Sequence, residues 1–237
     1  MEIAGQIKSS LMLSANPENA RFLQGYFKTG PGQYGEGDRF IGVRVPEVRR
    51  VLKHYKNLTP DDVLPLLHSS VHEERLFALL ALIRCFERAD QALRQQIFTL
   101  YLDNTAWINN WDLVDCSAPQ IVGGYLLQGA RDRLYLLARS TNVWERRIAI
   151  MATFAFIRSG QYSDTLEISE ILLADKEDLI HKATGWMLRE VGKREVIAEE
   201  QFLRRHCRVM PRTMLRYAIE RFPEQTRRMY LSGKQWK

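Results

Sequence analysis

The chain of 237 residues has few cysteines and no long apolar run. Its three cysteines, Cys85, Cys116 and Cys207, are far apart and odd in number. They offer neither a disulfide framework nor the close spacing of zinc ligands, so we expect a reducing, cytoplasmic location. No apolar stretch approaches the roughly 20 residues that span a membrane. The N-terminus also lacks the basic start and apolar centre of a signal peptide.

Metal ligands are equally scarce. The five histidines form no ligand pattern. His68 and His72 are four residues apart, a spacing that zinc ligands on a helix can have, but no cysteine or third ligand is spaced to join them. We therefore expect no metal and no cofactor.

Signals of β-structure are few. Alternating runs of β-branched residues are absent, and no Asn-Gly or Asp-Gly pair marks a hairpin turn. Apolar residues recur instead at helical spacing, for example from Leu76 to Phe86 and from Ile148 to Ala155. These patterns predict an all-α fold.

Residue types that begin and interrupt helices support this prediction. Asn16-Pro17, Thr59-Pro60 and Ser163-Asp164 fit the N-cap and first-turn preferences of helices. Gly30 to Asp38 is rich in glycine, which indicates a loop, and Pro46 then opens a helix expected to run from Glu47 to His54.

A repeat of about 35 to 40 residues runs along the chain, a period typical of HEAT-like solenoids. The alanines at positions 78, 149, 183 and 218 mark it, and the first interval holds two repeats. We predict a single HEAT-like or armadillo-like repeat domain of antiparallel helix pairs over residues 1–237, with N-terminal helices over 1–57 and repeats over about 58–237.

A basic residue precedes each of these alanines. We expect the four to line a concave basic face, where a cation at a helix start suits phosphate; they are Arg75, Arg147, Lys182 and Arg216. The alternative for each is a surface ion pair with a neighbouring glutamate. Four such residues in register weaken that alternative.

The net charge of +6 is unevenly distributed. Residues 1–130 hold 13 Lys and Arg against 14 Asp and Glu, whereas residues 131–237 hold 21 against 14. A basic second half favours a polyanionic partner, and a solvated surface is the alternative. The basic stretch from Arg204 onward either extends a phosphate track or is a solvated end.

The most distinctive stretch is Trp111-Asp112-Leu113-Val114-Asp115. Asp112 and Asp115 are three residues apart, and Trp111 and Asp115 are four apart, so on a helix they are near neighbours. One interpretation is a helix cap, with Asp112 capping or orienting and Trp111 in the core. The other is a carboxylate beside an aromatic wall, facing a cationic substrate.

These stretches resemble the AlkD family of DNA alkylation-repair glycosylases. The resemblance runs from about Asn16 to Arg216. Its most specific pieces are residues 111–115, 143–149 and 182–190, with softer pieces at 26–28 and 40–46. One departure is Asn110, where a member of the family has a second tryptophan.

The resemblance implies roles for individual residues. Asp115 matches the catalytic carboxylate, and the residues expected beside it in the catalytic set are Trp111, Trp186 and Arg147. Contacts to DNA are expected from Tyr26, Lys28, Arg75, Arg147, Lys182, Arg189 and Arg216. A structural Asp115–Arg147 ion pair is the alternative, because a buried carboxylate is costly unless it is paired.

The resemblance also implies an activity. Members of this family are all-α, HEAT-like proteins that remove cationic N3- and N7-alkylated purines from duplex DNA, so we expect a monomeric glycosylase acting on such DNA. A non-catalytic HEAT module that binds bent, branched or damaged DNA is the main alternative, and it does not need Asp115. A protein-binding scaffold is the third and would need apolar concave positions.

Overall fold

The computed structural model describes residues 2–232 and divides the chain into two compact units, Met1–Ser117 and Ala118–Lys237. Within residues 2–232 the regular structure is helical, and the only β-type pairing is an isolated bridge between Arg39 and Val71. The predicted all-α class is confirmed. None of the helices described is long and apolar enough to cross a membrane. The single repeat domain over 1–237 stays a prediction.

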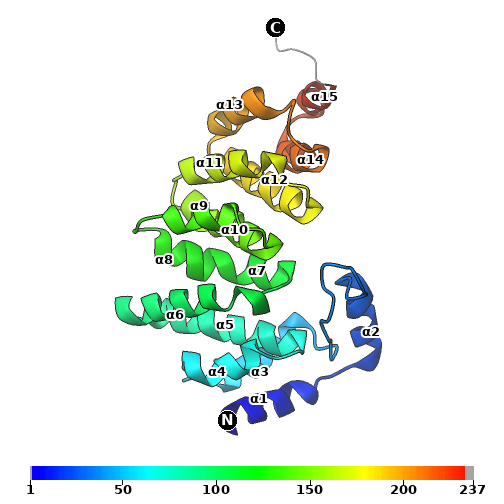
Figure 1. The fold of residues 1–237 in the computed structure, drawn as a ribbon, viewed down its shortest axis with the longest axis vertical. Helices are drawn as coiled ribbons and strands as arrows, with labels where there is room; N and C mark the ends of the chain where they lie inside the picture. The colour runs from blue at the N-terminus through cyan, green and yellow to red at the C-terminus, as the bar shows by residue number, and fades with distance from the viewer. Residues whose placement is uncertain (1, 233–237) are drawn as a thin grey trace. The chain divides into compact units, whose positions relative to one another are not determined.

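The first unit is built around α5. Its elements are α1 (Glu2–Met12), α2 (Pro17–Tyr26), α3 (Val45–His54), α4 (Pro60–Leu67), α5 (His72–Arg88), α6 (Gln91–Asp103), the short 3-10 helix η1 (Thr105–Trp107) and α7 (Trp111–Ala118). Helices α3, α4 and α6 pack against α5, and α1 packs against α3 and α4 (Figure 1). A loop with no helix joins α2 to α3.

Side-chain caps explain where several of these helices begin. The side chain of Asn16 accepts a hydrogen bond from the backbone N–H of Asn19, and Pro17 occupies the first turn of α2. Thr59 and Asp62 form a reciprocal capping box at the start of α4. The predicted starts at Asn16 and Thr59 are therefore confirmed, and the glycine-rich segment 30–38 lies in the α2–α3 loop as expected.

The second unit consists of two layers of helices. Its elements are the π-helix η2 (Pro119–Gly123), α8 (Gly124–Leu126), α9 (Asp132–Ala138), α10 (Val143–Arg158), α11 (Ser163–Ile171), η3 (Leu172–Ala174), α12 (Asp178–Gly192), α13 (Val196–His206), α14 (Arg212–Ala218), η4 (Ile219–Arg221) and α15 (Glu224–Ser232). Helices α10, α12 and α14 pack in sequence to form one layer, while α9 and α11 pack against α10 and α13 against α12 (Figure 1). This alternation is that of HEAT-like helix pairs.

Small residues allow the helices of this unit to approach closely. The repeat alanines Ala149, Ala183 and Ala218 are at most 1% exposed. A Cβ atom added to Gly185 of α12 would lie 2.4 Å from the carbonyl oxygen of Met214. Ala149 lies on α10, Ala183 on α12 and Ala218 on α14, so the sequence repeat maps onto one layer.

Candidate functional site

Helix α7 carries the distinctive stretch of the first unit. Its first residue is Trp111, so the prediction that Trp111 to Asp115 lie on one helix is confirmed. Trp111, Asp112 and Asp115 are all half-buried. The four-residue spacing puts the Trp111 indole and the Asp115 carboxylate on neighbouring turns of one face.

Stacked rings hold the indole of Trp111 in place. Trp111 stacks on Phe27 with centroids 5.2 Å apart and planes 17° apart. Phe27 stacks on Phe40 at 5.1 Å, and Phe40 stacks on the imidazole of His72 at 4.5 Å. Tyr26 adds an edge contact to Trp111 at 6.1 Å. The start of α7 is thus packed against the end of α2, the α2–α3 loop and the start of α5.

A buried polar network runs beneath this stack. Nδ1 of His72 lies 3.0 Å from Oδ2 of Asp38, and Nε2 of His72 lies 2.8 Å from Oδ2 of Asp112. Arg75 donates to the other oxygen of Asp38 at 2.6 Å and to the carbonyl of Ser69 at 2.9 Å. Two carboxylates and two basic side chains therefore balance one another inside the unit, as buried charges require.

Asn110 connects the network to the helix backbone. It is fully buried, donates to Asp38 at 3.3 Å and accepts a bond of 2.9 Å from the N–H of Trp111. The other oxygen of Asp112 accepts a bond of 2.9 Å from the N–H of Leu113. The expected orienting role of Asp112 is in keeping with these contacts, and Asn110 is a polar anchor at the position of the second tryptophan.

The network sets the protonation of its members. Burial lowers the pKa of His72, but the charge and hydrogen bond of Asp112 and the bond to Asp38 outweigh it and raise that pKa to about 8. Burial alone would raise the pKa of Asp38, but the bond from His72 and the charge of Arg75 hold it below its usual value. Near neutral pH the network therefore contains an imidazolium and ionised Asp38.

Asp115 affects two neighbouring groups through its charge. Burial, followed by the charges of Asp112 and Asp115, raises the pKa of the Cys116 thiol. Burial also raises the pKa of Tyr101, to which Asp115 adds. Cys116 is therefore a protonated thiol and not a nucleophile.

A cavity of about 380 Å³ lies beside the stack. Its lining is mostly apolar and comes from α2, the α2–α3 loop, α3, α5 and α7. The acidic and basic side chains in it are Arg44, His72, Glu73 and Asp112. Both Glu73 oxygens accept bonds from loop amides, of which the shortest is 2.7 Å to the N–H of Gly42. Glu73 thus holds the loop, and His72 and Asp112 are bonded to each other.

The residues expected to bind DNA in the first unit lie in two different environments. Tyr26 is 56% exposed beside Trp111, and Lys28 is exposed in the loop that follows. Arg75, in contrast, is 2% exposed, because its guanidinium is bound to Asp38 and Ser69. The surface position expected for Arg75 is not found.

The expected catalytic residues of the second unit are also partly enclosed. Arg147 on α10 is 5% exposed and donates a hydrogen bond to the carbonyl of Leu179. Trp186 on α12 is half-buried, donates from Nε1 to Glu190 at 3.3 Å and lies 6.3 Å from the ring of Phe154. Trp186 is therefore held by its own helix and by α10, and its catalytic role stays a prediction.

The other cations expected to contact DNA differ in exposure. Lys182 pairs with Asp178 at 2.7 Å, and both side chains are exposed. Arg189 forms an ion pair with Glu220, and Arg216 is exposed on α14. Two members of the predicted row, Arg75 and Arg147, are buried. The prediction that all four cations of the row lie on the surface is therefore wrong.

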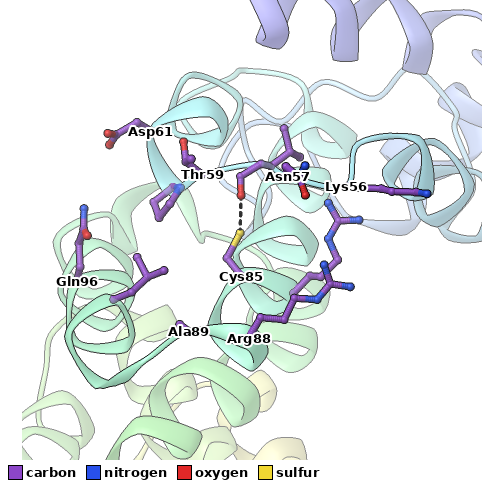
Figure 2. A pocket seen from close by; sticks show the side chains of 12 residues that line it. Lys56, Asn57, Thr59, Asp61, Cys85, Arg88, Ala89 and Gln96 are labelled. Carbon is purple, nitrogen blue, oxygen red and sulfur yellow. Dashed lines mark hydrogen bonds between the residues drawn. The ribbon is translucent and has the colours of Figure 1, made fainter.

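A second cavity in the first unit, of about 440 Å³, contains none of the predicted site residues (Figure 2). The Cys85 thiol in it donates to the carbonyl of Leu58 at 3.0 Å, and burial raises the pKa of that thiol. Arg84 caps the end of α3 through the carbonyls of Leu52 and Tyr55. This cavity therefore holds a protonated thiol and a structural arginine.

Metal ligation has no support in the described part of the chain, where no group of three or more His, Cys, Asp or Glu side chains is arranged to hold an ion. His68 bonds to the side chain of Asn104, while His72 is enclosed by Asp38 and Asp112. His68 and His72 are thus hydrogen-bonded to different side chains and do not face a common site.

The chain is similar to known proteins in sequence and in fold. A family profile described as DNA alkylation repair enzyme matches residues 7–222. A solved structure titled as a predicted DNA alkylation repair enzyme from Enterococcus faecalis is 17% identical, with a TM-score of 0.69 over 89% of this chain and 98% of that chain. At this identity the likeness shows a shared fold. No curated protein matches the chain.

Proposed function

Because the chain belongs to the DNA alkylation repair enzyme family, we propose that it is a DNA glycosylase that removes cationic N3- and N7-alkylated purines from duplex DNA. The observation that carries the proposal is the arrangement on α7. There Asp115 and Trp111 share one face of a helix whose start is fixed by stacked rings and a buried ionic network.

Removal of a cationic purine requires few catalytic groups. An N3- or N7-alkylpurine carries a positive charge, so its glycosidic bond is already weakened and the base leaves without protonation. The sugar then develops oxocarbenium character, which a nearby carboxylate stabilises as in glycosidases. Asp115 supplies that charge and orients the attacking water.

Aromatic faces complement a cationic nucleoside. A cation over an indole gains about 0.5 to 2 kcal/mol, with the larger values in desolvated sites. Trp111 is proposed to make this contact in the first unit, and Trp186 in the second. Arg147 is proposed to contact the phosphates beside the lesion, as the resemblance implies.

Duplex DNA is the proposed partner, bound by a monomer without cofactor. Tyr26 and Lys28 are exposed near Trp111, and Lys182 and Arg216 have exposed or part-exposed cationic ends. The excess of 21 basic over 14 acidic residues in 131–237 supports phosphate binding. Lys234 and Lys237, in the basic C-terminal stretch, lie outside the described residues.

A non-catalytic DNA-binding module is the second candidate, favoured by the same basic excess. The two are separated by incubating the protein with a duplex containing one N7-methylguanine and measuring abasic sites. The glycosylase produces them, and a duplex with uracil at the same position stays intact because uracil is neutral. Salt-dependent binding without abasic sites would favour the module.

A further inference from the structure

His72 is bonded at both ring nitrogens to carboxylates. Its side chain is 2% exposed, with Asp38 3.0 Å from Nδ1 and Asp112 2.8 Å from Nε2. A neutral imidazole has a single N–H, so only the imidazolium donates at both nitrogens. The observed geometry is therefore that of the protonated ring.

We propose that His72 is a positioning residue for the face of α7 that carries Trp111 and Asp115. Its imidazolium bonds to both Asp38 and Asp112 and so holds the start of α7 in place. Loss of the imidazolium proton breaks the bond to Asp112. The catalytic part of this inference rests on the proposed function. The conformational part concerns the protein alone.

The bond to Asp112 is the one that opens. Asp38 keeps Arg75 and Asn110 as donors and its side chain is 3% exposed, so it has no water to replace a lost bond. Asp112 is 18% exposed and has His72 as its side-chain donor. Water can replace that donor at Asp112, whereas at the buried Asp38 no water can replace the bond from His72.

Release of Asp112 acts directly on the helix start. Asp112 is the second residue of α7, between Trp111 and the turn that carries Asp115. When both bonds are present, the network holds α7 through Asp112 and through Asn110, which accepts the N–H of Trp111. When the bond to Asp112 is lost, the indole of Trp111 and the carboxylate of Asp115 are held less firmly. The carboxylate then stabilises the charge that develops in the transition state less well, because it is less well preorganised.

The surroundings of His72 place this change near physiological pH. Uncharged Phe40 covers the ring, and Phe27 lies next to it. The charged groups around it are Asp38 and Arg44 from the α2–α3 loop, Glu73 and Arg75 from α5, and Asp112 from α7. Because the pKa of His72 in the folded protein is raised from 6.5 to about 8, both of its hydrogen bonds are present below about pH 6.5, and the bond to Asp112 is lost as pH rises through about 8.

The first experiment follows His72 and Trp111 in the free, full-length protein by NMR. The histidine ring signals are titrated from pH 6 to 9 and assigned by the loss of one set in His72→Gln; the exposed His68→Gln serves as the control. Fluorotryptophan labelling reports Trp111, assigned by Trp111→Phe. We expect His72 and Trp111 to titrate together with a midpoint near 8.

A His72 midpoint at or below 6.5, or a Trp111 signal that does not move with it, would overturn the inference. The second experiment measures single-turnover excision over the same pH range. If only the protonated form is active, the rate falls about tenfold between pH 7 and 9 in the wild type and in His68→Gln, while His72→Gln is slower and lacks this pH dependence. Absence of excision at every pH would contradict the proposed function, and the NMR result would still decide the inference.

Discussion

The indole of Trp111 lies nearly parallel to the ring of Phe27, with 5.2 Å between the centroids and 17° between the planes. Phe27 is 7% exposed and closes one face of the indole. The contact joins the residue after α2 to the first residue of α7, so residues far apart in the sequence fix the aromatic group that begins the helix of Asp115.

Replacing Phe27 with leucine should destabilise the first unit and loosen Trp111. Stacked aromatic pairs contribute about 0.5 to 1.5 kcal/mol beyond burial, and loss of buried volume adds to this, so we expect a loss of about 1 to 3 kcal/mol in unfolding free energy. Chemical denaturation measures it. The control Phe22→Leu, at a 65% exposed site on α2, should change it by under about 0.5 kcal/mol. Equal effects of the two variants would contradict the proposed role of the stack.

Glu199 on α13 should make stability depend on pH. Burial, helped by the charge of Glu200, raises its pKa from 4.5 to about 8. Because the folded pKa is raised, the folded state binds this proton more tightly, so the contribution of Glu199 to stability is fully present below about pH 4.5 and is lost as pH rises through about 8. Thermal unfolding between pH 5 and 9 should show this decline in the wild type.

Glu199→Gln should remove that part of the pH dependence, since an amide keeps the shape without a charge. Glu200→Gln should instead move the decline to lower pH, because it removes only the neighbouring charge that helps to raise the pKa of Glu199. A wild-type profile unchanged by Glu199→Gln would show that Glu199 is ionised in the folded protein.

Arg216 should contribute to DNA affinity without sequence preference. It is exposed on α14, in the layer formed with α10 and α12. Removing one phosphate contact lowers the slope of log affinity against log salt by about 0.9, so Arg216→Ala should weaken binding to all duplexes alike. Arg133→Ala, at an exposed position on α9, is the matched control and should leave the slope unchanged. If both variants behave as the wild type, Arg216 does not bind DNA.

The sequence predicted local features better than buried pairings. Helical periodicity, the caps at Asn16 and Thr59, and the shared face of Trp111 and Asp115 all follow from near neighbours in the chain. The bonds of His72 to Asp38 and Asp112 do not, since they join a loop and two helices at separations of 34 and 40 residues.

The burial of Arg75 could not be predicted for the same reason: it depends on a partner that is distant in the sequence. Its position before a repeat alanine is shared with Arg147 and Lys182, and that pattern alone suggested a cationic surface. Its partner Asp38 lies in an irregular loop, which periodicity cannot position. The role of Asn110 was not predictable either, because it depends on a hydrogen bond to Asp38. In the sequence, Asn110 was notable only because it departs from the family pattern.

Single-turnover release of N7-methylguanine from duplex DNA by Asp115→Asn tests the proposed catalytic role of Asp115. The amide keeps the shape of the side chain but cannot stabilise a developing cation, so the rate should fall by at least about a hundredfold while duplex affinity stays near wild type. Asp103→Asn, at the exposed end of α6, is the control and should excise normally. A rate near wild type for Asp115→Asn would contradict the assignment of Asp115 as the catalytic carboxylate.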